Sequence, residues 1–68
     1  MIRLTGKTRK GKNRVNTNGA EYDFVESRDK VSFDDEPGPW LLITSIANPK
    51  SMRWVHKTDD IDFIIEVI

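Results

Sequence analysis

The residues best placed to do chemistry in this 68-residue chain are a run of cations near its start. Residues 1–20 contain no Asp or Glu, so their charge of +6 comes from six cations: Arg3, Lys7, Arg9, Lys10, Lys12 and Arg14. Residues 21–68 carry five cations and eleven acids, which sum to −6. A segment of one sign creates a local field that attracts phosphate. The sequence therefore predicts that the protein binds a polyanion, although the net charge of the whole protein is zero.

We expect this run to contact nucleic-acid phosphates. The expected contacts are Lys7, Arg9, Lys10, Lys12 and Arg14, with Arg53 and Trp54 as flanking contacts. Gly6 and Gly11 would let the backbone approach a polyanion closely. If about five phosphates were neutralised, the salt slope on B-DNA would be about −4 to −5. Three alternatives stay open: the charges solvate a loop, they pair with the protein's own acids, or they bind an acidic protein.

Enzymatic chemistry is not expected. Residues 6–12 match the first part of a P-loop, but Asn13 stands where the magnesium-binding Ser or Thr should be. There is no cysteine, so thiolate sites and disulfides are excluded. His56 is the only histidine, and no nucleophile motif accompanies it. We expect no catalytic residue, no cofactor and no metal.

Two acidic segments could in principle hold a divalent cation through carboxylate oxygens. They are 34–36 (Asp-Asp-Glu) and 59–62 (Asp-Asp-Ile-Asp), and neither has EF-hand spacing. Asp side chains also satisfy free backbone N–H groups in turns. Turn formation is therefore the expected role of both segments, which could also serve as the internal counter-charge of the basic run.

Short β-branched or aromatic runs bounded by turn residues predict strands throughout the chain. The expected strands are 2–5, 13–17, 20–26, 30–33, 40–46, 52–56 and 63–68. Residues 6–14 are expected to form a basic loop, and Asn18-Gly19 the type I′ turn of a hairpin. Turns are also expected at 27–29, at 47–51 and at 58–60, and a loop at 34–39.

The six aromatic side chains are expected mostly in the core, because a domain this small needs them for packing. They are Tyr22, Phe24, Phe33, Trp40, Trp54 and Phe63. Trp54, beside Arg53 and near His56, is the first expected exception, available to stack on an unpaired base. Tyr22 is the second, since its hydroxyl needs water or a partner.

Short strands joined by tight turns predict an all-β fold, a single antiparallel β-barrel domain spanning residues 1–68 with five or six strands. The order of elements after Trp40 resembles SH3-like barrels. An α+β alternative would require residues 59–68 to be helical. No apolar run approaches the ~18 residues that span a bilayer, so a soluble, cytoplasmic protein without a signal peptide is expected.

The run 6–15 (GKTRKGKNRV), followed by Gly19, resembles the opening of short uncharacterised proteins of tailed bacteriophages. Segments 40–42, 53–55 and 60–63 are similar to the same group. The resemblance implies a small accessory protein acting in the host cytoplasm, and it transfers no catalytic residue. It also supports the alternative function, a protein-interaction module that modulates a host protein. A third alternative is a small assembly part in which a sheet edge such as 63–68 pairs with a neighbouring subunit. The partner's identity, any base preference and the oligomeric state remain open.

Overall fold

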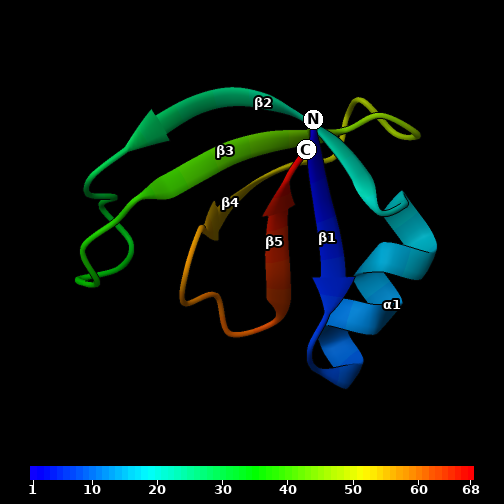
Figure 1. The fold of residues 1–68 in the computed structure, drawn as a ribbon, viewed down its shortest axis with the longest axis horizontal. Coiled ribbons are helices and arrows are strands. Elements are labelled where there is room, and N and C mark those ends of the chain that lie inside the picture. Colours follow the sequence, from blue (N-terminus) through cyan, green and yellow to red (C-terminus); the bar gives the residue numbers. More distant parts are fainter.

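The computed structural model describes residues 1–68 as one antiparallel sheet with a single helix. The elements are β1 (Ile2–Gly6), α1 (Arg9–Asn18), β2 (Glu21–Arg28), β3 (Trp40–Ser45), β4 (Met52–His56) and β5 (Phe63–Val67). The strand order is β4-β3-β2-β1-β5, so the first and last strands pair. The sheet curls into a half-barrel (Figure 1). This confirms the expected small, all-β, barrel-like fold, with five strands.

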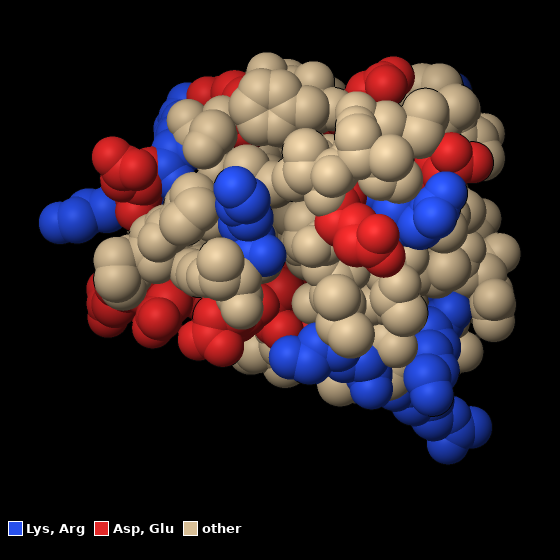
Figure 2. Space-filling view, viewed as in Figure 1, with Lys and Arg blue, Asp and Glu red and all other residues tan.

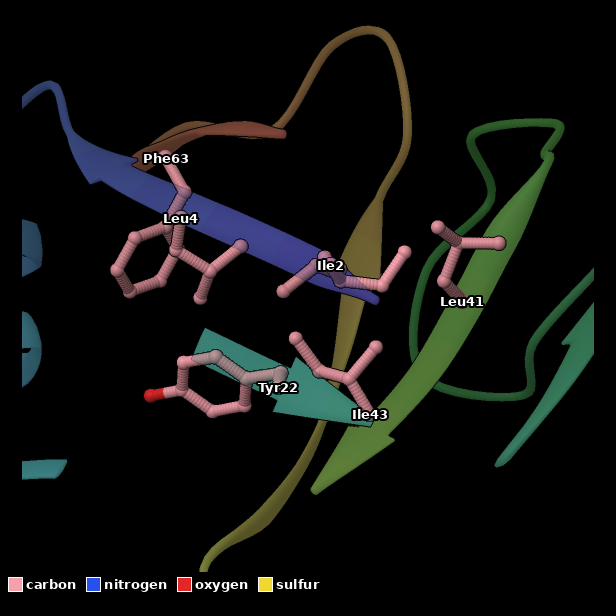
Figure 3. Packing of buried hydrophobic residues seen from close by; sticks show 7 residues of the cluster. Ile2, Leu4, Tyr22, Leu41, Ile43 and Phe63 are labelled. Carbon is pink, nitrogen blue, oxygen red and sulfur yellow. The ribbon is translucent and has the colours of Figure 1, made fainter. Parts of the chain in front are cut away.

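The core lies on the concave face of the curled sheet. Antiparallel pairs place the side chains of paired residues on the same face, as with Leu4 and Ile65 or Leu41 and Val55. The cluster of seven buried side chains comes from all five strands: Ile2, Leu4, Tyr22, Leu41, Ile43, Val55 and Phe63 (Figure 3). Val15 of α1 packs against this cluster, which places the helix over the concave face.

A smaller cluster forms on the convex face, under the long β2–β3 loop. The Trp40 indole Nε1–H donates to the Glu36 carbonyl at 2.9 Å, and Phe33 packs edge-on against the same indole. The His56 ring stands edge-on to Trp40 with 4.9 Å between ring centroids. This packing holds the acidic loop against β3 and β4.

The expected basic loop at 6–14 and strand at 13–17 are wrong, because residues 9–18 form α1. Asn18-Gly19 is not a type I′ hairpin turn. Gly19 instead ends the helix with φ of 87°, and its N–H donates to the Val15 carbonyl at 2.8 Å. The sequence correctly located a residue that needs positive φ, but the need comes from a helix C-terminus.

The expected strand at 30–33 is also wrong. Only an isolated bridge joins Val31 to Asp34, and Phe33 is 63% exposed rather than in the core. β2 continues through the expected turn at 27–29 as far as Arg28, after a bulge between Phe24 and Glu26. The expected strands at 2–5, 40–46, 52–56 and 63–68 are confirmed to within one residue. Because β5 occupies the C-terminal segment, the α+β alternative with helical residues 59–68 is excluded.

The aromatic side chains divide evenly between core and surface. Trp40, Phe63 and Tyr22 are buried, so Tyr22 is not the exposed exception that was expected. Phe24 and Phe33 are exposed, and Trp54 is half-buried. The only helix has ten residues and no long apolar stretch, so the structure contains no helix able to cross a membrane.

Candidate nucleic-acid interface

The N-terminus of α1 is fixed to the β4–β5 connection. Thr8 caps the helix: its Oγ1 accepts from the Gly11 N–H at 3.0 Å and donates to Asp62 Oδ1 at 2.7 Å. The Lys7 N–H donates to the Asp62 carbonyl, and Lys7 Nζ donates to the Asp60 carbonyl. The basic segment is therefore anchored to the barrel at this end.

The C-terminus of α1 is fixed to the β3–β4 turn. Ser45 Oγ donates to the carbonyl of the buried Asn18, and the Asn48 amide donates to Asn18 Oδ1 at 3.4 Å. Because both ends are held, the exposed surface of α1 keeps one orientation relative to the sheet.

The cations of α1 surround its solvent-facing side. Successive residues of a helix are rotated by about 100°, so Gly11, Val15 and Asn18 share the face turned toward the barrel. Four cations occupy the exposed remainder: Arg9, Lys10, Lys12 and Arg14. On a helical projection Arg9 lies centrally, Lys10 and Arg14 on one flank and Lys12 on the other. The exposed amides of Asn13 and Asn16 lie beside Arg9.

None of these helical cations is neutralised by a carboxylate of the protein. The only ion pair in the structure joins Arg28 to Glu26 on β2. In Figure 2, Lys and Arg gather at the lower right over α1, whereas Asp and Glu gather at the lower left. Asp62 is the one acid in direct contact with the helix N-terminus, through Thr8. The positive field of α1 is therefore mostly left uncancelled.

The charges of α1 disfavour the helix that carries them. The first turn contains no acid and holds cations beside the positive end of the helix dipole. Lys10 and Arg14 are also four residues apart, a spacing that brings like charges together on the helix surface. Local rules of stability are commonly violated at functional surfaces.

The two expected flanking residues do not lie together. In β4, Arg53 pairs with the buried Ile43 and so points to the concave face, where its guanidinium lies 4.6 Å from the Phe63 ring centroid. Trp54 is on the convex face, where Arg28 lies over its ring at 5.5 Å. Alternation along the strand separates them, so they cannot form a joint contact next to α1.

Burial raises the pKa of the Tyr22 hydroxyl, and the positive charges of Arg53 and Arg14 lower it in part. Figure 3 shows this hydroxyl pointing away from the other labelled core side chains. Arg53 Nε is buried and has no hydrogen-bond partner in the protein. Arg53 is thus the expected flanking residue that the fold brings near α1.

An acidic pocket of about 390 Å³ is lined mainly by residues of the β2–β3 loop and of the β4–β5 connection. Its lining combines five acids with Arg53, Trp40, His56 and Ile61; the acids are Asp34, Glu36, Asp59, Asp60 and Asp62. No group of His, Cys, Asp and Glu side chains has the arrangement to hold a metal ion. The pocket's charge favours a cationic ligand and opposes a phosphate.

Asp60 and His56 of this pocket are occupied by structural hydrogen bonds. One Asp60 oxygen accepts from the His56 N–H, and the other accepts from the Asp62 and Phe63 N–H groups. His56 Nδ1 accepts from the Asp59 N–H at 2.9 Å, so Nε2 carries the hydrogen donated to the Pro37 carbonyl. The expected turn at 58–60 is confirmed.

The helix that carries the cations was missed for a physical reason. Of its ten residues only Val15 is a large apolar residue, so no amphipathic stripe exists to detect. The available signals were Thr8 as an N-cap and Gly19 as the residue after the C-terminus. No protein-family model, curated protein or solved structure matches the chain.

Proposed function

We propose that this protein is a non-enzymatic module that binds nucleic acid through the exposed face of α1. The observation that carries the proposal is a fixed helix with four exposed cations, none of which is paired with a carboxylate. Phosphate contacts dominate the affinity of such a surface and carry no sequence information. Arg53 lies near Arg14 but also lines the acidic pocket, so it is not counted among the phosphate contacts, and Trp54 lies on the convex face.

The helical arrangement lowers the number of phosphates engaged at once. Because the cations are spread around the exposed side, one strand backbone meets the central Arg9 and one flank, Lys10 with Arg14. Lys7 is already bonded to the Asp60 carbonyl. We therefore expect a salt slope of about −3 on B-DNA, rather than the −4 to −5 of five contacts.

The test is a titration of labelled duplex DNA, single-stranded DNA and RNA at two salt concentrations. The wild type is compared with Arg9→Glu/Lys10→Glu, and with Lys30→Glu/Lys57→Glu as a control of equal charge change. Both control residues are exposed and lie outside α1. We expect the helix variant to bind at least about tenfold more weakly and the control to stay within about threefold.

A stability measurement on the same variants separates function from folding. Replacing cations by acids in the first helical turn should raise the free energy of unfolding by about 0.3–1 kcal/mol per charge. A helix variant that is more stable yet binds less identifies the cations as a binding surface. Equal losses in both variants, or binding that ignores salt, would refute the proposal.

The acidic pocket supports a second candidate, a module that binds a host protein through a Lys or Arg side chain. The free carboxylates of Glu36 and Asp59 would meet the cation, beside the Trp40 ring. Titration with a lysine-rich peptide, followed through the Trp40 indole N–H resonance, tests this. Glu36→Gln/Asp59→Asn should abolish the response, and affinity capture from host lysate with nuclease should then retain a protein. Peptide binding that survives this double substitution would contradict it.

A further inference from the structure

The free edge of β5 carries an unprotected set of backbone hydrogen-bonding groups. β5 is the last strand of the sheet and pairs only with β1. The Ile68 N–H donates to the Met1 carbonyl and the Lys7 N–H to the Asp62 carbonyl, which fixes the alternation of the β1–β5 ladder. Residues 64, 66 and 68 therefore bond to β1. The N–H and C=O groups of Ile65 and Val67 point outward.

This edge lacks the features that usually prevent strands from pairing. The strand has no Pro, no Lys and no bulge, and Glu66 is its only charge. Ile64 (54%) is exposed near the start of the strand, and three exposed apolar side chains lie at its C-terminal end: Met1 (53%), Val67 (63%) and Ile68 (62%). The two termini meet there, as Figure 1 shows. The other edge strand, β4, is partly covered, because the His56 N–H is bonded to Asp60.

We propose that a second copy of this chain pairs with β5 in antiparallel fashion, forming a two-fold symmetric dimer. The chain is self-complementary in one register, centred on Ile65. There Phe63 faces Val67 of the second copy, and the concave-face side chains on both sides are apolar. The net charge of zero leaves no overall repulsion between copies.

Electrostatics selects this register, and the outward hydrogen-bonding groups are compatible with it. Centring on Glu66 would set two carboxylates directly opposite each other, which is destabilising. Centring on Ile65 sets Glu66 against Ile64 and forms four inter-chain hydrogen bonds. Two join the Ile65 residues, and two run from the Val67 N–H of one copy to the Phe63 carbonyl of the other. The Phe63 N–H is already bonded to Asp60.

The dimer would present both basic helices on one side. The two-fold axis of an antiparallel strand pair is perpendicular to the sheet, so the concave faces of both copies lie on the same side. α1 covers the concave face through Val15. This consequence rests on the proposed function: two linked surfaces would bind a long nucleic acid more tightly than one. Dimer formation itself does not depend on it.

The test is the solution mass of the chain across a concentration series, in the absence of nucleic acid. We expect a concentration-dependent dimer for the wild type. Val67→Lys, which places a charge on the edge, should raise the dimer dissociation constant at least about tenfold. Ile46→Lys, an exposed residue in the β3–β4 turn, is the control with equal charge change and should dimerise as the wild type does.

A second variant keeps the test independent of charge. Val67→Pro removes an outward N–H that makes no bond to β1, so the fold should persist, as far-ultraviolet circular dichroism would check. It removes two of the four inter-chain hydrogen bonds and should also weaken the dimer. A wild type that stays monomeric at millimolar concentration, or variants that dimerise unchanged, would overturn the proposal. If the wild type is monomeric but still binds DNA, the dimer proposal is refuted and the proposed nucleic-acid binding is not.

Discussion

Tyr22 is the residue where the core and the basic surface meet. Its ring is only 1% exposed, and it pairs with Ile2 and Ser45 in the neighbouring strands. Its hydroxyl is influenced by two arginines from distant parts of the chain. A sequence reading could identify a Tyr that needs a partner, but not which cations the fold would bring to it.

Tyr22 should make stability fall at alkaline pH. Burial raises its pKa above the usual value of 10.0. In the folded state the phenol therefore stays protonated at pH values where the unfolded chain has already ionised. The contribution is fully present below pH 10 and is lost as pH rises through the folded-state pKa. Urea unfolding at about pH 8 and about pH 11 measures this loss.

The control for this prediction is Tyr22→Phe, which keeps the ring and removes the ionisation. Every other ionisable group is common to the two proteins, so the difference between them reports Tyr22 alone. The wild type should lose more stability than the variant between the two pH values. Parallel losses would contradict the prediction.

At the scale of elements, α1 is held by close approach rather than by an apolar face. A Cβ on Gly11 would lie 2.1 Å from the Asp62 carbonyl oxygen. The helix can therefore pack against the β4–β5 connection only with glycine at this position. The contact between Gly11 and Asp62 therefore fixes the position of the α1 cations relative to the sheet.

Gly11→Ala should destabilise the protein, against the usual preference of helices for alanine. Propensity alone would stabilise the helix by up to about 1 kcal/mol. The clash with Asp62 should outweigh this, for a net loss of about 1–3 kcal/mol. Asn16→Ala, an exposed site in the same helix, should instead gain a few tenths of a kcal/mol. Denaturant unfolding of both variants measures the difference, and stabilisation by Gly11→Ala would contradict the close packing.

The strands were more predictable than the helix. β3, β4 and β5 each contain β-branched or aromatic runs bounded by turn residues, so local pattern and final structure agree. The segment 30–33 has the same alternation but lies in the β2–β3 loop, where Phe33 packs against Trp40. The pattern cannot show whether a neighbouring strand is available to pair with it.

The whole molecule has a small core, with only 12 of 68 residues buried. At the usual ~0.05–0.15 kcal/mol per residue, a chain of this length has about 3–10 kcal/mol of stability. A single large cavity therefore removes much of it. Ile43 is one of two residues that are 0% exposed, and it lies between β2 and β4.

Ile43→Ala should reduce the free energy of unfolding by about 2–5 kcal/mol, through lost burial and the cavity left behind. A large fraction of the variant would then be unfolded at 37 °C. Ile46→Ala, at an exposed turn position, should change stability by no more than about 0.5 kcal/mol. Chemical unfolding monitored by tryptophan fluorescence measures both. Equal effects at the two sites would contradict the assigned core.

The sequence by itself determined the fold class, four of the five strands nearly to the residue, and the separation of charge between residues 1–20 and the rest. These follow from local patterning and from counting. Only the tertiary structure decided that the cations stand on a capped helix, because Thr8 and Asn18 find their partners in distant turns. It also decided that Arg53 lies on the concave face and Trp54 on the convex face, since strand pairing fixes which face each side chain takes.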